Sequence, residues 1–183
     1  ASGAALADWK PVEQIEYYAI TGRTGPELYA SIGERGPKAG IGRAIAFTNF
    51  KLTWRRDYQP QQDGSCKLVS ARPRLILIYA LPKPSQKLSE PVASNWKTFF
   101  EGVRRHERVH GDMIVEMVRE IEAYSVGLSV ANDPNCKKIR TTLTERLAQI
   151  SQAQRARSRD FDRVEFSDGG AQHQLILSFV NGG

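Results

Sequence analysis

The sequence predicts one α+β domain over residues 1–183. Its composition, with 40% hydrophobic and 25% charged residues, is typical of one ordinary globular domain. Apolar and polar residues alternate in the first half of the chain, whereas apolar residues repeat every three or four positions in the second half. We therefore expect an antiparallel or mixed sheet of about four strands, packed on a long helix and on a second helix antiparallel to it.

The chain begins with a predicted strand and a short helix. Residues 14–21 contain the run IEYYAI, whose aromatic and β-branched residues favour a strand. Thr24 and Glu27 then have the spacing of a capping box, which predicts that a helix starts there and continues to about Gly33.

A hairpin of two long strands is predicted next. Residues 44–54 alternate between apolar and polar side chains, which indicates a strand. Residues 59–64 are rich in turn formers, and the β-branched and apolar residues in 66–80 favour a second strand.

The longest predicted element is an amphipathic helix. Pro82, Pro84 and Pro91 predict an irregular segment before it, and Ser94 stands where an N-cap belongs. Residues 96–124 then carry apolar side chains every three or four positions, which is the helical period.

Two further elements complete the predicted fold. Residues 132–135, with the sequence NDPN, form a tight break, and the apolar spacing over residues 139–161 predicts a second helix. Because the connection is short, the two helices should pack as an antiparallel hairpin. Residues 174–180 read as a last strand that returns to the sheet.

The long helix carries the motif His106-Glu107-Arg-Val-His110, which matches HExxH. Side chains four residues apart lie one helical turn apart on one face, so two imidazoles can bind one Zn²⁺. Zinc lowers the pKa of a water ligand to about 7, and a glutamate beside the first histidine can accept its proton. The motif therefore predicts a protein with a zincin-like fold. It also predicts that the protein hydrolyses peptide bonds, with Glu107 as the general base.

The competing interpretation of the motif is a pair of core histidines with no ion. That interpretation suits a single inward-facing histidine. Here, however, two of only three histidines in the chain lie one turn apart on the buried stripe with Glu107 between them. This combination favours zinc binding by His106 and His110.

A catalytic zinc needs a third protein ligand, for which the sequence offers two candidates. In an antiparallel hairpin that turns near residues 133–134, equal distance from the turn places His106 opposite Asp160 and His110 opposite Ala156. Asp162 lies near this level, and the loop beyond it ends at His173, the only other histidine, so these two residues are the candidates.

The two cysteines, Cys66 and Cys136, lack the CxxC spacing of metal and redox motifs and favour one disulfide. A disulfide implies an oxidising compartment, so we expect a secreted or periplasmic protein. The first residue, Ala1, reads as the mature end left by processing. No apolar run is long enough for a membrane-spanning helix, so we expect no integral membrane segment.

The net charge of +6 and the pI near 9.5 raise the question of an anionic partner. The basic residues on the two predicted helices are scattered and have no interleaved aromatic platform. We therefore expect no nucleic-acid partner, and cell-envelope association through anionic polymers is the alternative to a simply solvated surface.

Several segments of the sequence have the pattern of a known bacterial family. They are residues 18–22 and 25–28, Cys66, residues 96–99, the motif at 106–110, Cys136, and Phe161-Asp162 before a Gly-rich C-terminal strand. On these residues, which extend over nearly the whole chain, the sequence resembles the family described as secreted zinc-dependent proteases and otherwise as a domain of unknown function.

The resemblance implies roles for individual residues. By it, His106 and His110 bind zinc, Glu107 is catalytic, and Cys66 pairs with Cys136. Family members carry Tyr-Asp and then a Thr-x-His-Gly segment near the C-terminus, whereas this chain has Phe161-Asp162 and then Asp168-Gly169. This departure leaves Asp168 as a replacement third ligand or His173 as a shifted one.

The sequence thus supports two functions. The first is a secreted or periplasmic zinc-dependent peptidase that binds an extended peptide or protein substrate by strand addition. The alternative is a non-catalytic cell-envelope binding or assembly protein with a structural or vestigial zinc site. Glu107 discriminates between them, because a structural site is closed by four protein ligands and needs no base.

Overall fold

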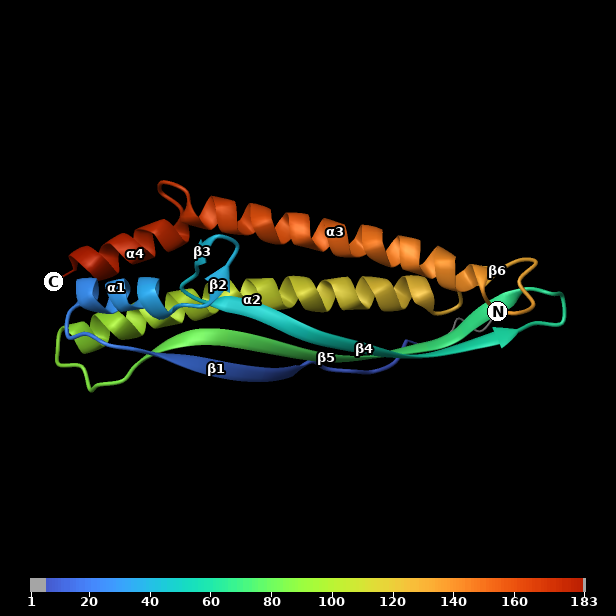
Figure 1. The fold of residues 1–183 in the computed structure, drawn as a ribbon, viewed down its shortest axis with the longest axis horizontal. Helices are drawn as coiled ribbons and strands as arrows, with labels where there is room; N and C mark the ends of the chain where they lie inside the picture. The colour runs from blue at the N-terminus through green and yellow to red at the C-terminus, as the bar shows by residue number, and fades with distance from the viewer. Residues whose placement is uncertain (1–5, 183) are drawn as a thin grey trace. The chain divides into compact units, whose positions relative to one another are not determined.

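The computed structural model describes residues 6–182, which form the expected α+β fold (Figure 1). Over these residues the chain contains four helices, a four-stranded mixed sheet and a separate two-stranded hairpin. The elements, in chain order, are β1 (Val12–Ile20), α1 (Gly25–Arg35), β2 (Lys38–Ala39), β3 (Gly42–Arg43), β4 (Phe47–Pro60), β5 (Cys66–Pro84), α2 (Val92–Ser125), β6 (Ser129–Val130), α3 (Lys138–Phe166) and α4 (Ala171–Asn181).

The main sheet has the order β1-β5-β4, with β6 also paired to β5. The predicted hairpin of two long strands is confirmed: β4 and β5 are joined by a turn in which the Gln61 N–H donates to the Ser65 carbonyl at 2.8 Å. β6 pairs antiparallel with the start of β5. At the end of β1, the Ile20 carbonyl accepts the N–H of Ser85, the residue after β5, at 2.9 Å. β1 and β5 therefore end side by side and run parallel, whereas β6 is antiparallel to β5, so the sheet is mixed.

The chain forms two compact units, whose boundaries fall within β1, β4, β5, α2 and α3. Among the described residues, unit 1 comprises 6–12, 50–76 and 113–157, and unit 2 comprises 13–49, 77–112 and 158–182.

Unit 1 is organised around a disulfide between Cys66 and Cys136, whose Cα atoms are 5.3 Å apart. The pairing expected from the sequence is therefore present. The disulfide is buried in an apolar cluster that draws on β5 and α3, with side chains of β4 packed against it. The buried members besides the cysteines are Leu68, Ala71, Ile139 and Leu143.

The start of α3 in unit 1 is fixed by the buried side chain of Asp133. Its carboxylate accepts the backbone N–H groups of Lys137, Lys138 and Ile139 at 2.9 to 3.0 Å. These are N–H groups of the first helical turn that have no partner within the helix. The NDPN break predicted from the sequence thus has a second role as the N-terminal cap of α3.

Unit 2 has its core between the end of β5, the first part of α2 and the two short helices α1 and α4. Phe99 of α2 stacks on Phe179 of α4 with ring centroids 4.4 Å apart, and Trp96 meets the edge of Phe179. Gly25 starts α1 against the backbone of α4, where any Cβ would overlap the Phe179 carbonyl. This close approach explains why α1 begins with glycine.

The prediction of a final strand over residues 174–180 is wrong, because these residues form most of α4. The apolar run has no strict alternation. Instead, Leu175 and Phe179 are four residues apart and pack on α2 at Gly102 and Phe99 respectively. Packing on α2 therefore outweighs the strand propensity of the apolar run.

Two predicted boundaries also differ from the structure. β5 continues through Pro82 and Pro84, because the fixed φ of proline is compatible with extended backbone at a strand end. α2 begins at Val92, so Ser94 lies inside its first turn rather than at the N-cap. The side chain of Glu90 supplies the cap, since it accepts from both the N–H and the hydroxyl of Ser94.

None of the helices formed by residues 6–182 has the length and apolar character that crossing a lipid bilayer requires.

Reduction of the disulfide should destabilise unit 1. The bond closes a loop between residues 70 positions apart, for which loop-closure entropy gives about 4 kcal/mol of stability. We expect a lower midpoint in thermal unfolding under reducing conditions, and a Cys66→Ser/Cys136→Ser variant whose midpoint does not respond to reductant. An unchanged wild-type midpoint after complete reduction, verified by thiol titration, would contradict this prediction.

Candidate metal centre

The two histidines of the motif lie one turn apart on α2, on the side that faces α3. His106 and His110 are only 3% and 7% exposed. Their Nε2 atoms are 3.2 Å apart, and the two rings are inclined at 77° to each other. Both rings therefore aim their Nε2 atoms at one point.

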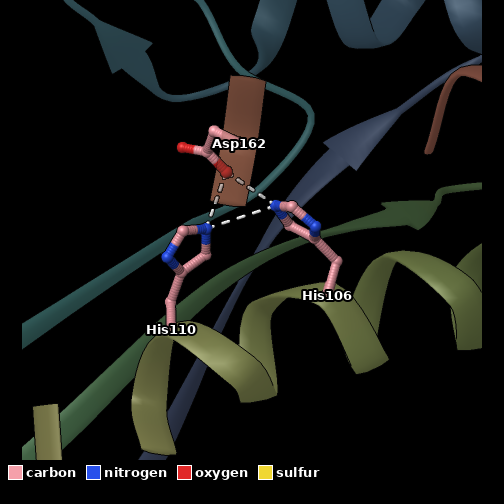
Figure 2. Close-up of side chains that lie close together, drawn as sticks. All are labelled: His106, His110 and Asp162. Atoms are coloured by element: carbon pink, nitrogen blue, oxygen red, sulfur yellow. Dashed lines mark hydrogen bonds and ion pairs between the residues drawn. The ribbon is translucent and has the colours of Figure 1, made fainter. Parts of the chain in front are cut away.

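A carboxylate from α3 meets the two rings at that point (Figure 2). Asp162 Oδ1 lies 2.8 Å from His106 Nε2 and 2.7 Å from His110 Nε2. Within residues 6–182, these three side chains form the one group of histidine, cysteine and carboxylate ligands compact enough to hold a metal ion.

The face that α3 presents to the histidines extends over two and a half turns. Ser158, Phe161, Asp162, Glu165 and Phe166 follow the three- and four-residue spacing of one helical face. The predicted helix ended at about residue 161, whereas α3 continues to 166 and brings this whole set to α2.

The other ring nitrogens have partners of their own from this face. Glu165 Oε1 lies 3.2 Å from His106 Nδ1, and Ser158 Oγ lies 2.7 Å from His110 Nδ1. These residues were not predicted from the sequence, although their spacing around Asp162 could have indicated them. Such hydrogen bonds from the distal ring nitrogen orient metal-binding histidines in many proteins.

Two phenylalanines enclose the histidine rings. Phe161 stacks on His106 with centroids 4.7 Å apart and meets His110 edge-on, and Phe166 meets His106 edge-on at 5.3 Å. The rings are therefore held in place by apolar contacts as well as by hydrogen bonds, and water is excluded from their faces.

The donor set fits a divalent transition-metal ion. An ionised Glu165 can only accept a hydrogen bond, so the His106 Nδ1 atom carries the proton in their contact. In a neutral His106 ring, Nε2 then has a lone pair, and this lone pair points at another acceptor, Asp162 Oδ1. Either a second proton on the His106 ring or a metal ion between these atoms removes the conflict. Tetrahedral Zn²⁺ with Zn–N of about 2.1 Å requires ligand atoms about 3.4 Å apart. The two Nε2 atoms, 3.2 Å apart, are close to this spacing, whereas Asp162 Oδ1, 2.8 and 2.7 Å from them, would have to draw back for an ion to bind.

The charges of the site shift the ionisation of its members. Burial lowers the pKa of the His106 imidazole, but the carboxylates of Asp162 and Glu165 outweigh burial and raise it. For Asp162, burial raises the pKa, but the contacts with His106 and His110 outweigh burial and hold that pKa well below its usual range. The site therefore favours a charged carboxylate beside a positive group.

The model of one protein family matches residues 15–170, a span that includes every residue of this centre. It is described as a bacterial protein of unknown function (DUF922). The chain belongs to this family. No curated protein and no solved structure matches it. The family description assigns no activity, so the chemistry of the DUF922 chain has to be argued from the site itself.

Glu107 of this DUF922 chain lies between the histidine face of α2 and the sheet, and is 6% exposed. Thr48, at the start of β4, donates its hydroxyl to Glu107 Oε2 at 2.5 Å. Burial raises the pKa of Glu107, whereas the hydrogen bond from Thr48 acts in the opposite direction. The carboxylate is thus fixed in position next to His106.

The other third-ligand candidates do not join the two histidines. His173 lies on α4 and interacts with the loop before that helix: its Nδ1 accepts from the Gly169 N–H at 3.2 Å, and its Nε2 is 4.0 Å from Asp168 Oδ1. The sequence predicted Asp160 opposite His106, whereas in the structure His106 faces Asp162, about half a turn further along α3. Of the candidates named from the sequence, Asp162 is the one beside the motif.

The residue after His110 is a glycine in close contact with the sheet. A Cβ at Gly111 would overlap the Tyr79 hydroxyl and lie 3.1 Å from Tyr79 Cζ. Burial raises the pKa of Tyr79 to about 12, so this hydroxyl stays protonated at neutral pH. Gly111 therefore sets how closely α2 approaches β5 beside the candidate metal centre.

Gly111→Ala should destabilise the protein by about 1 to 3 kcal/mol through overpacking, despite the higher helix propensity of alanine. Tyr79→Phe in the same chain should recover part of the loss, because the hydroxyl is the atom nearest to the added methyl group. Chemical denaturation of the two single variants and the double variant measures both effects. An alanine variant at least as stable as wild type would contradict the packing described here.

Proposed function

We propose that this DUF922 chain is a zinc-dependent peptidase in which His106, His110 and Asp162 hold the ion and Glu107 is the general base. One observation carries the proposal: three ligand atoms of the kinds that bind zinc converge on one point, with a buried carboxylate adjacent to them in the helix. The hydrogen bonds of Glu165 and Ser158 to the distal ring nitrogens support the same reading, since metal-binding histidines have such partners.

When bound, Zn²⁺ supplies a Lewis acid that lowers the pKa of water and polarises a carbonyl oxygen. The chain supplies the base. Glu107 accepts the proton of the attacking water and can return it to the leaving amine. Thr48 donates to Glu107 Oε2 and so orients the carboxylate, leaving Oε1 for the transferred proton.

Access to the site is expected on the α3 side. The side chain of Asp162 is 50% exposed, whereas that of His106 is 2% exposed. Three protein ligands leave one position of a tetrahedral zinc site for water or substrate, as catalytic rather than structural sites require.

The sheet offers a way to bind an extended peptide. β4 stands at the end of the strand order, and its residue Thr48 touches Glu107. A substrate strand added along the start of β4 would have its backbone beside the base, with main-chain hydrogen bonds providing affinity. We therefore propose a peptide or protein as the substrate.

The disulfide supports a secreted or periplasmic location. Disulfides persist in oxidising compartments, and Cys66 and Cys136 pair within a buried cluster of unit 1.

The second candidate is a non-catalytic cell-envelope binding or assembly protein with a structural or vestigial zinc site. The distances favour the vestigial form of this site: Asp162 Oδ1 lies within 2.8 Å of both Nε2 atoms, as in a network that protons link directly without an ion. In this case Glu107 would contribute only to packing and to the hydrogen bond with Thr48.

The purified chain should contain about one zinc ion, which His106→Ala, His110→Ala and Asp162→Ala should each remove. Glu165→Gln should weaken zinc binding about 10- to 100-fold, because it removes the partner of a ligand rather than a ligand. Metal analysis after dialysis and competition with a chromophoric chelator measure both effects. His173→Ala is the matched control and should retain full zinc. Equal zinc content in wild type and all ligand variants would overturn the site.

Glu107→Gln should keep the zinc and lose peptide hydrolysis by about 10²- to 10⁴-fold, the usual contribution of a general base. The matched control is Glu101→Gln, an exposed glutamate on the same helix, which should hydrolyse peptides like the wild type. Cleavage of a mixed peptide library, followed by mass spectrometry, gives the readout. Zinc binding with no cleavage by the wild type would favour the second candidate, and undiminished cleavage by Glu107→Gln would reassign the base.

A further inference from the structure

The positive charge of the chain is concentrated in one segment of unit 1. Residues 50–76, which run from within β4 to within β5, contain six basic and two acidic residues, a net charge of +4. The whole chain has a net charge of +6. The charge is therefore not evenly spread, in contrast to the scattered basic residues of the helices.

Strand geometry places most of this charge on one side of the sheet. Alternate residues of β4 point inward, as Trp54 and Tyr58 do toward the disulfide cluster, and the residues between them point outward. Five basic side chains are exposed on the outward positions of the two strands, and we call them the basic face. They are Lys51, Arg55, Lys67, Arg72 and Arg74.

The sixth basic residue, Arg56, serves as a contrast. It lies on the inward side, is half-buried and stacks over the ring of Trp54 with its guanidinium 5.4 Å from the ring centroid. Its charge is thus used in packing, whereas the charges of the basic face are directed at solvent.

No acidic residue neutralises the basic face. Among the ion pairs formed within residues 6–182, none includes any of its five members. Among the strand residues of 50–76, the single acidic one at an outward position is Asp57, which accepts a hydrogen bond from Gln59. Because like charges held together repel, such a face is better accommodated against an anionic partner.

We propose that the basic face binds the surface of an anionic lipid bilayer. The charges are spread over two adjacent strands rather than lined along a groove, which suits a flat array of phosphate headgroups. Besides Asp57, the exposed outward residues on these strands include Thr53, Gln59 and the 37% exposed Val69, an apolar side chain that can contact the interface. A polybasic patch of this kind is attracted to acidic lipids within a Debye length of the surface.

Nucleic acid is the other polyanion to consider, and two observations disfavour it. The outward positions of the basic face carry no aromatic side chain on which bases could stack. In addition, Cys66, at the start of the same β5, is disulfide-bonded, which favours a compartment outside the cytosol. The proposal concerns unit 1 and stands whether or not the metal centre of unit 2 is catalytic.

The test is co-sedimentation of the full chain with vesicles. Wild-type protein should bind vesicles of phosphatidylcholine with 30 mol% phosphatidylglycerol at low salt, should be released at 1 M salt, and should not bind pure phosphatidylcholine. The variant Arg55→Gln/Arg72→Gln/Arg74→Gln should bind on the order of 100-fold more weakly.

The matched control is Arg155→Gln/Arg157→Gln/Arg159→Gln, which removes the same charge from exposed positions of α3. It should bind within a few-fold of wild type, and thermal unfolding checks that both variants are folded. Equal losses in both variants would show that net charge alone drives binding and would overturn the proposal. It would also be overturned by absence of binding at low salt, or by tighter binding to duplex DNA than to the vesicles at equal salt.

Discussion

Two imidazole nitrogens and a carboxylate oxygen lie within 3.2 Å of one another in unit 2, and the arrangement of α2 and α3 around them depends on how that proximity is stabilised. When the Nδ1 proton of His106 points at Glu165, the lone pair on His106 Nε2 faces the lone pairs of Asp162 Oδ1. A proton or a metal ion between them resolves the opposition. Every other contact of the centre, including the phenylalanine walls and the Ser158 hydroxyl, serves to hold the rings in this orientation.

The centre is asymmetric in its construction. α2 contributes two buried histidines and Glu107, whose spacing is fixed by the helix itself, whereas α3 contributes one half-exposed carboxylate. Glu107 is held by a hydrogen bond from Thr48 of β4. A peptidase with this arrangement would keep its chemistry on a rigid helix and receive its substrate beside the sheet, while the second candidate function would need only the pairing of α2 with α3.

The parts of the fold with strict periodicity could be predicted from the sequence. The long α2, the hairpin of β4 and β5 and the placement of the motif on the buried face followed from spacing alone. The end of α3 could not be predicted, because the helix has a low mean hydropathy and its last turn contacts His106 rather than the apolar core. Glu165, which lies in that turn, was therefore missed. α4 was missed because Phe179 is held by a distant ring, that of Phe99, and local propensity carries no information on such a contact. The basic face was missed because its residues alternate with core residues along each strand.

The half-exposed carboxylate has a consequence for how the molecule assembles. His106 and His110 are neighbours within one helical turn, but Asp162 follows them by more than fifty residues. An ion captured first by the helical pair would recruit Asp162 only when α3 docks, and would then act as a reversible cross-link between two distant parts of the chain. Metal supply would in that way become a folding cue, and depletion would loosen α3 from α2 at its C-terminal turns.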